Sequence, residues 1–257
     1  MVGDKIAVDL GGTFLRVAVV KNNKIIRYKK IRTPKQKNKL LKELTSSIEE
    51  FISWKVRGIG VAFAGPLEKD TVKNPPNLPL KNFNLKNYLQ EKFKKRVEIE
   101  NDANCVAIAE AKLGCKKKNF IILTLGTGIG GGIIINGELY KGRGMAGEFG
   151  HIILDSKKTA ENLWQNKKGK IIDLLKRNEK KQLKKTAECL GKAIGSLINV
   201  FDPEIVILAG GVRETGSRFL NIVKKETEKY SFIPRKTDIR WSRLSHPGIL
   251  GASLLVK

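Results

Sequence analysis

Residues 5–20 read KIAVDLGGTFLRVAVV, and residues 120–135 read FIILTLGTGIGGGIII. Each stretch consists of an apolar run, a turn rich in glycine and threonine, and a second apolar run. Runs of β-branched residues separated by a tight turn are typical of a β-hairpin. The return of the same pattern predicts that the chain contains two copies of one structural unit.

The elements that follow the two hairpins also correspond. A third strand closes each hairpin, and a helical stretch and an apolar strand come next in both halves. That last strand ends in small residues, Gly65-Pro66 in the first half and Gly210-Gly211 in the second. The pattern predicts an α/β fold built from a duplicated β-β-β-α-β unit.

The duplication suggests two α/β lobes. We place the N-terminal lobe at residues 1–115 and the C-terminal lobe at residues 116–257. A closing helix within residues 245–257 is expected to pack back on the first lobe. Irregular loops at strand ends expose backbone N–H groups that bind ligands, so we expect a central cleft between the two lobes.

Composition narrows the class of protein. Of the 257 residues 41% are hydrophobic, enough for a buried core, and the formal net charge is +25. A positive balance of this size favours a polyanionic partner. The lysines lie in short scattered groups, however, and the aromatic residues, 7% of the chain, do not alternate with them. We therefore do not expect nucleic acid as the partner.

Membrane and secreted classes are disfavoured as well. No run approaches the roughly 18 apolar residues of a membrane helix. The three cysteines, Cys105, Cys115 and Cys189, form neither a C-x-x-C pair nor a disulfide pattern. We expect a cytoplasmic protein with no membrane partner.

The first hairpin turn contains Gly11, Gly12 and Thr13. Glycines let the backbone approach an oxyanion closely, and successive N–H groups can then hold a phosphate. One such turn is weak evidence, but a second one at residues 126–132 suggests that two loops hold one polyphosphate. Asp9 ends the strand before the first turn and could hold Mg²⁺, directly or through water; the alternative is that its side chain only forms the turn.

Asn101 and Asp102 follow a predicted strand and precede a predicted helix. Both are natural N-cap residues, and capping alone would explain them. At the end of a strand that faces the expected cleft, however, a carboxylate can accept a proton from an attacking hydroxyl. We assign Asp102 as the general base of a phosphoryl transfer and Asn101 as a ligand of a sugar hydroxyl.

A second polar group lies in the glycine-rich run from Gly144 to His151. Glu148 and His151 are three residues apart and could both contact a polyol, the carboxylate as acceptor and the imidazole as donor or acceptor. A single histidine in such a segment is otherwise often structural.

Taken together, these motifs resemble the ROK family of sugar kinases, within the actin-like ATPase superfamily of ribonuclease H-like folds. The resemblance spans nearly the whole chain, and its most specific part runs from Gly126 to His151. Its motifs are Asp9-Leu-Gly-Gly-Thr13, Asn77-Leu-Pro79, Asn101-Asp102-Ala-Asn104, Gly126-Thr-Gly-Ile-Gly-Gly-Gly132, Gly147-Glu-Phe-Gly-His151, Phe201-Asp-Pro203 and Leu208-Ala-Gly-Gly211.

The resemblance implies roles for further residues. Asp102 would deprotonate the sugar 6-hydroxyl. The sugar ligands would be Gly65, Asn77, Asn101, Glu148 and His151. The ligands of ATP would be Gly11, Gly12, Thr13, Thr127 and Gly128 at the phosphates and Gly210 and Gly211 at the nucleoside.

Two departures from the family pattern stand out. Related chains follow the histidine with a cysteine-rich zinc loop that ends in a sugar-binding glutamate, but no cysteine lies between Cys115 and Cys189 here. We expect no structural zinc, with Glu161 in the place of that glutamate. Phe14 also stands where lysine or asparagine is frequent, which changes the phosphate contacts.

The sequence thus predicts a hexose kinase that uses ATP and Mg²⁺, with glucokinase as the first interpretation. Kinases of N-acetylmannosamine, N-acetylglucosamine or fructose are alternatives on the same scaffold. A non-catalytic sugar-sensing or nucleic-acid-binding protein is the alternative from another class. The resemblance also favours a homodimer.

Overall fold

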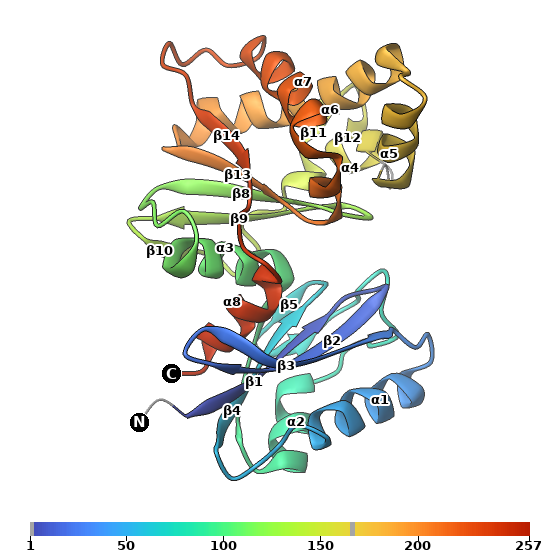
Figure 1. The fold of residues 1–257 in the computed structure, drawn as a ribbon, viewed down its shortest axis with the longest axis vertical. Coiled ribbons are helices and arrows are strands. Elements are labelled where there is room, and N and C mark those ends of the chain that lie inside the picture. The colour runs from blue at the N-terminus through green and yellow to red at the C-terminus, as the bar shows by residue number, and fades with distance from the viewer. Residues whose placement is uncertain (1–2, 165–167) are drawn as a thin grey trace. The chain divides into compact units, whose positions relative to one another are not determined.

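The computed structural model describes residues 3–164 and 168–257 (Figure 1). Its contacts divide the chain into two units. Unit 1 consists of the chain up to Ala109 together with Arg143–Met145 and Leu244–Lys257, and unit 2 consists of Glu110–Gly142 and Ala146–Arg243. The lobe boundary after residue 115 stays a prediction.

Unit 1 contains a sheet of five strands in the order β3-β2-β1-β4-β7. The first three strands are antiparallel neighbours, and β4 and β7 are added parallel to β1. The strands are β1 (Asp4–Leu10), β2 (Phe14–Lys21), β3 (Lys24–Arg32), β4 (Val56–Phe63) and β7 (Arg96–Asn101).

Unit 2 repeats this topology with the order β10-β9-β8-β13-β14, again antiparallel in the first three strands and parallel in the last two. The repetition confirms the predicted mixed α/β fold. The strands are β8 (Phe120–Leu125), β9 (Ile129–Ile135), β10 (Glu138–Tyr140), β13 (Ile205–Ala209) and β14 (Asp238–Trp241).

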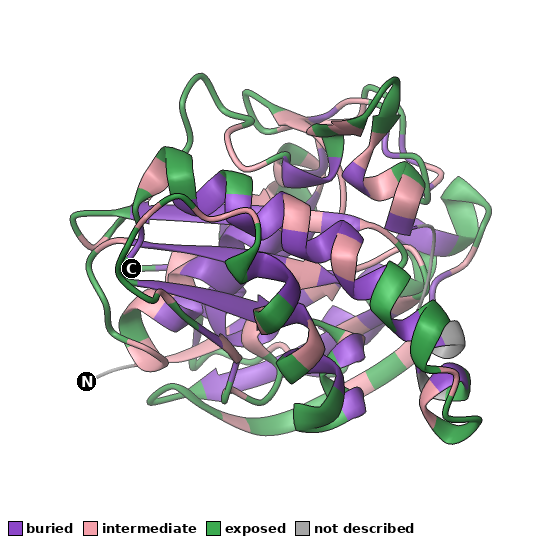
Figure 2. Ribbon diagram, turned by 90° about the horizontal axis from the view of Figure 1, so that it is seen from above, coloured by how far each residue is buried: buried purple, intermediate pink, exposed green. Residues whose placement is uncertain are grey.

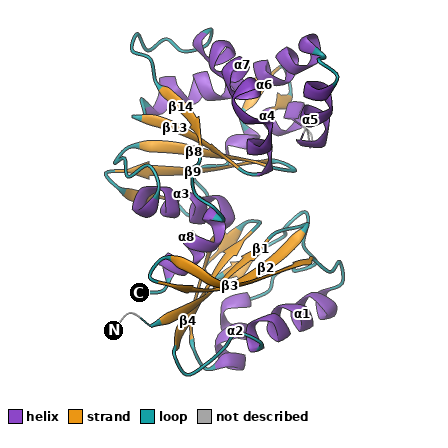
Figure 3. Ribbon diagram, in the orientation of Figure 1, coloured by secondary structure: helices purple, strands orange, loops and turns teal. Residues whose placement is uncertain are grey.

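Helices cover the sheets (Figure 3). No helix in the described ranges is long and apolar enough to cross a membrane. The helices are α1 (Lys37–Glu49), α2 (Leu85–Phe93), α3 (Asp102–Leu113), α4 (Ala160–Trp164), α5 (Lys168–Lys176), α6 (Lys180–Phe201), α7 (Gly216–Glu228) and α8 (Pro247–Leu255), with short 3-10 turns at Phe149–His151 and Gly211–Thr215. Two small hairpins complete the fold, β5 (Leu67–Glu68) with β6 (Thr71–Val72) and β11 (Ile153–Asp155) with β12 (Lys158–Thr159).

Each unit has its own hydrophobic core, and Figure 2 shows most of the strands as buried. In unit 1 the alternating residues Ile6, Val8 and Leu10 of β1 pack with Leu40 and Leu44 of α1. Burying one such aliphatic side chain stabilises a protein by roughly 1.5–3 kcal/mol. The alternation of the first hairpin therefore explains both the strand and the face on which its helices lie.

The opposite face of the unit 1 sheet is covered by α8, which contacts β1 and β4. Glycine makes the close contact possible. A Cβ on Gly60 of β4 would lie 1.8 Å from the carbonyl oxygen of Ala252, and one on Gly251 would lie 1.8 Å from the carbonyl oxygen of Cys105. The last residues of the chain thus belong to the same unit as the first strand.

We predict that Gly60→Ala forces α8 away from β4, because the new methyl group would overlap a backbone carbonyl. Overpacking of this kind costs about 3 kcal/mol, which lowers Tm by roughly 6–12 °C in a chain of this size. Thermal unfolding followed by circular dichroism measures the effect. Gly126→Ala is the control, because a Cβ there meets nothing within 4 Å. A Gly60→Ala protein that melts with the wild type would contradict the packing described.

Candidate active site

The backbone of the first glycine turn is held from one side. The carbonyl oxygens of Gly11, Gly12 and Thr13 accept hydrogen bonds from Thr33 Oγ1 at 2.6 Å, Lys35 Nζ at 2.7 Å and Thr33 N at 3.0 Å. In a planar trans peptide the N–H points opposite to the carbonyl. The N–H groups of Gly12 and Thr13 therefore point away from residues 33–35, an arrangement suited to an anion.

The turn lies against other residues predicted to bind the sugar. A Cβ on Gly12 would be 2.5 Å from Cβ of Asn77, and one on Gly65 would be 2.7 Å from Cβ of Pro75. The amide of Asn101 donates from Nδ2 to the Gly65 carbonyl at 3.4 Å. Unit 1 thus brings together Gly12, Asn77, Gly65 and Asn101, which are far apart in the sequence.

Asp102 stands at the start of α3, directly after β7. Its Oδ1 accepts from the backbone N–H of Ala103 at 2.9 Å, and Asn101 Oδ1 accepts from the N–H groups of Ala103 and Asn104 at 2.9 and 3.2 Å. The predicted capping is therefore present. It also fixes the direction of the Asp102 side chain, and the positive end of the helix stabilises its negative charge.

Asp9 is paired with a residue that the sequence analysis did not single out. Arg16 lies opposite Asp9 in the β1–β2 register, and its Nη1 is 2.7 Å from Asp9 Oδ2. Burial raises the pKa of the Asp9 carboxyl, and the neighbouring guanidinium opposes that change. Counting residues across the tight turn would have found this pair, because the hairpin register sets position 16 opposite position 9.

His246 is a second residue absent from the sequence-based site. Its ring packs against that of Tyr28, tilted by 39° and with 4.7 Å between centroids, and its backbone has φ 50° at the start of α8. Burial first, and then the charge of Arg16, lower the pKa of the imidazole, while Asp9 opposes this. Nothing in the sequence relates residue 246 to residue 28, so only the fold reveals the contact.

Asp9 is compatible with Mg²⁺ bound together with a nucleotide. Mg²⁺ is ordinarily held by one or two protein carboxylates and by phosphate oxygens. Asp9 offers one carboxylate beside the glycine turn. Within residues 3–164 and 168–257, no three His, Cys, Asp or Glu side chains lie close enough to hold a metal ion.

The second glycine loop, in unit 2, is held by side chains. Trp164 Nε1 donates to the carbonyl of Gly126 at 3.1 Å, and the N–H of Ile129 donates to Glu161 Oε2 at 3.0 Å. A Cβ on Gly128 would lie 2.2 Å from the same carboxylate oxygen. Glu161 therefore contacts the second loop directly, while Thr127 is exposed.

Glu148 and His151 lie close to Glu161 in unit 2. His151 Nε2 is 3.9 Å from Glu148 Oε2, and the two side chains are 69% and 46% exposed, respectively. Between them in the sequence is Gly150, whose Cβ would be 3.1 Å from Glu161 Oε2. Glu148 and His151 are thus accessible to a ligand, while Glu161, whose Oε2 accepts from Ile129 N, lies beside the glycine between them.

Gly210 and Gly211 follow β13, beside the end of β8. Gly210 has φ 96°, which favours glycine, and a Cβ there would be 2.4 Å from the carbonyl oxygen of Leu125. Leu125 directly precedes the second glycine loop. The predicted nucleoside residues are therefore neighbours of the predicted phosphate loop within unit 2.

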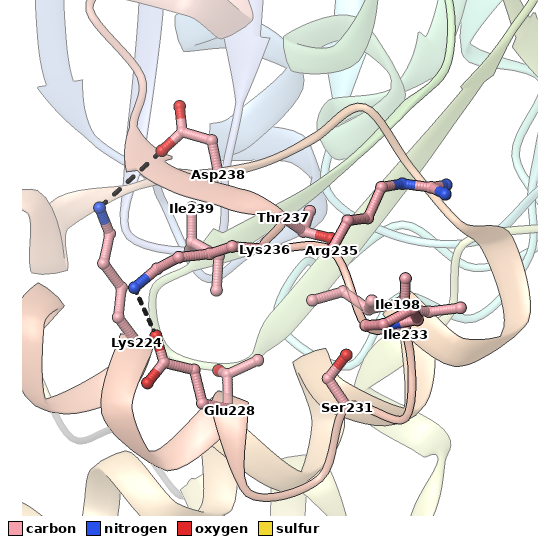
Figure 4. Close-up of a pocket in the computed structure, with 12 residues that line it drawn as sticks. Ile198, Lys224, Glu228, Ser231, Ile233, Arg235, Lys236, Thr237, Asp238 and Ile239 are labelled. Atoms are coloured by element: carbon pink, nitrogen blue, oxygen red, sulfur yellow. Dashed lines mark ion pairs between the residues drawn. The ribbon is translucent and has the colours of Figure 1, made fainter.

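A cavity of about 470 Å³ lies elsewhere in unit 2, between α7 and the segment that leads into β14 (Figure 4). Two of its lysines form ion pairs with acidic side chains: Lys236 Nζ is 2.7 Å from Glu228 Oε1, and Lys224 Nζ is 3.8 Å from Asp238 Oδ1. No residue predicted from the sequence to bind sugar or nucleotide lines this cavity. This cavity is therefore distinct from the loops described above.

Known proteins match this chain in sequence and in fold. A family model described as the ROK family matches residues 5–169 and 156–257. A glucokinase from Halalkalibacterium halodurans is 29% identical, over 98% of this chain and 94% of its own, and a xylose repressor from Caldicellulosiruptor bescii is 28% identical, over 90% and 72%. The crystal structure of a ROK family glucokinase from Streptomyces griseus, in complex with glucose and AMPPNP, matches with a TM-score of 0.87 and 25% identity over 99% of both chains.

We predict that His246→Asn makes the stability of the protein less sensitive to acid. Because the folded state lowers the pKa of His246 from its usual 6.5, the unfolded chain takes up this proton first as the pH falls. The wild type should therefore lose free energy of unfolding relative to the variant between pH 8 and pH 5. Asparagine accepts the positive φ of residue 246.

Urea unfolding of both proteins at several pH values measures this difference. Asp9, whose raised pKa acts in the opposite direction, is present in both proteins, and because its carboxyl interacts with His246 the measured difference reports the two groups together. A difference in unfolding free energy that stays constant from pH 8 to pH 5 would show that His246 does not titrate as described.

Proposed function

The chain belongs to the ROK family, which confirms the resemblance of its motifs, and from this premise we propose that it is an ATP-dependent hexose kinase, with glucose as the first candidate substrate. One observation carries the proposal. In unit 1 the backbone N–H groups of Gly12 and Thr13 point away from residues 33–35, Gly12 lies against Asn77, and Asn101, which directly precedes Asp102, donates to the carbonyl of Gly65. A phosphate loop, amide ligands and a base in one unit are what phosphoryl transfer to a hydroxyl requires.

In the proposed reaction the sugar 6-hydroxyl attacks the γ-phosphorus of ATP. The new O–P bond forms while the bond to ADP breaks, and Asp102 accepts the hydroxyl proton. The hydrogen bond from Ala103 N to Asp102 Oδ1 keeps the carboxylate in place, so little reorganisation is needed during the reaction. Asn101, Asn77 and Gly65 would hold the sugar from unit 1.

Unit 2 would contribute the remaining ligands. We assign Glu148, His151 and Glu161 to the sugar, because a carboxylate accepts from hydroxyls and an imidazole can donate or accept. Thr127 and Gly128 would hold phosphate, and Gly210 and Gly211 would border the nucleoside.

The negative charge of the ATP phosphates would be offset in part by Mg²⁺ bound with ATP. Bound there, the ion would offset the negative charge that builds up on the transferring group. Asp9 would hold it, directly or through water. Arg16 would keep this carboxylate oriented, because its Nη1 lies 2.7 Å from Asp9 Oδ2.

A substrate panel with ATP and Mg²⁺ tests the proposed activity. We expect ADP release that depends on an added hexose and is fastest with glucose. Faster turnover with N-acetylmannosamine, N-acetylglucosamine or fructose would change the assigned substrate, while the proposed phosphoryl transfer from ATP would stand. No sugar-stimulated turnover with any of them would sink the proposal and favour a sugar-sensing role, in line with the relative that is a repressor.

We predict that Asp102→Asn lowers kcat by a factor of about 10²–10⁴ and leaves the affinity for the sugar nearly unchanged, because the amide keeps the size and the cap but cannot accept the proton. Steady-state kinetics and calorimetric sugar binding measure the two quantities. Asp70→Asn is the control, since Asp70 is exposed in unit 1, has φ 65° and forms a surface ion pair with Lys86. A near-normal kcat in Asp102→Asn would remove this residue from the base role.

A further inference from the structure

Lys35 connects two loops of unit 1 that are distant in the sequence. Its Nζ donates to the carbonyl oxygen of Gly12 at 2.7 Å and to that of Asn77 at 3.5 Å. Gly12 belongs to the proposed phosphate loop and Asn77 to the loop proposed to bind the sugar. One ammonium group therefore contacts the backbone of both loops.

Among the residues that the structure describes, no acid balances the charge of Lys35. Many lysines of this chain pair with acids, as Lys29 does with Glu50 at 2.7 Å. Among the described residues, no carboxylate lies within 4.0 Å of Lys35 Nζ, whose partners are two neutral carbonyls. An ammonium whose charge is left unpaired beside a glycine turn favours an anion bound there.

The turn itself brings no cation at residue 14. Phe14 begins β2, and its ring lies under the Nζ of Lys30 at 4.1 Å and the guanidinium of Arg16 at 5.6 Å. Arg16 is already paired with Asp9. Of these cations, Lys35 is the one whose hydrogen bond fixes the peptide that turns the Thr13 N–H outward.

We propose that Lys35 is a positioning residue that couples nucleotide binding to sugar binding. By holding the carbonyls of Gly12 and Asn77 at one point, it fixes the distance between the N–H groups that would take phosphate and the amide that would take a sugar hydroxyl. A ligand that orders one loop also restrains Lys35, and Lys35 in turn restrains the other loop. The second ligand then loses less conformational entropy when it binds, so the two ligands bind with positive cooperativity. This inference rests on the proposed kinase function.

Calorimetric titration tests the coupling. The dissociation constant of the hexose preferred in the substrate panel is measured with and without AMPPNP, for wild type, Lys35→Ala and Lys35→Arg. We expect tighter sugar binding in the presence of AMPPNP for the wild type, and a ratio near one for Lys35→Ala. In kinetics KM for ATP should rise about tenfold, the size expected for the loss of one charge-assisted hydrogen bond. Lys35→Arg should restore most of both effects.

Two controls distinguish a positioning role of Lys35 from an effect of net charge and from loss of the fold. Lys39→Ala removes the same charge from an exposed site on α1 four residues away and should leave the ratio and KM unchanged. A melting temperature of Lys35→Ala close to that of the wild type shows that the fold is retained. If Lys35→Ala does unfold, Lys35→Gln, which keeps a donor without the charge, replaces it.

The outcomes distinguish this inference from the proposed function. If the wild type phosphorylates a hexose and Lys35→Ala keeps both the wild-type coupling ratio and KM for ATP, the inference is wrong and the kinase stands. If Lys39→Ala changes both quantities as much as Lys35→Ala does, the effect is one of net charge and the inference also falls. A wild type that binds neither AMPPNP nor any hexose overturns both.

Discussion

The architecture of the candidate site depends on the way three consecutive carbonyls, those of Gly11, Gly12 and Thr13, are held by Thr33 and Lys35. These hydrogen bonds fix the direction of the peptide planes. A turn without them could rotate its peptides and present carbonyl oxygens, which repel phosphate. Because residues 33–35 directly follow the edge strand β3, the antiparallel hairpin itself delivers the groups that orient the turn.

In unit 2 the glycine loop is also held by hydrogen bonds, but different residues form them. There the loop from Gly126 is held by the indole of Trp164 and the carboxylate of Glu161, which come from α4 rather than from the neighbouring strand. Glu161 also adjoins Gly150, next to His151. A single carboxylate can thus link the conformation of the second glycine loop to the region of the proposed sugar ligands in unit 2. The two copies share a topology, and the contacts that stabilise their loops have diverged.

The sequence predicts those features that depend on local periodicity. The alternation in residues 5–20 and 120–135 is enough to predict both hairpins and the duplicated α/β fold, and the place of Asn101 and Asp102 after a strand is enough to predict the cap. Contacts between distant segments are not predictable in this way. Lys35 reaches Gly12 and Asn77, and His246 reaches Tyr28, only because the strands and α8 have assembled. Glu161 combines both kinds of evidence. The family resemblance predicts that it binds the sugar, and the fold shows that its carboxylate accepts from the N–H of Ile129.

The proposed reaction requires the turn at Gly11–Thr13 and the carboxylate of Asp102 to act on one phosphoryl transfer. A crystal structure with AMPPNP and the preferred hexose tests it most directly. We expect phosphate oxygens within hydrogen-bond distance of the N–H groups of Gly12 and Thr13, and a carboxylate oxygen of Asp102 about 2.6–3.2 Å from the sugar 6-hydroxyl. Phosphates that contact neither N–H group, or a hydroxyl out of reach of Asp102, would contradict it.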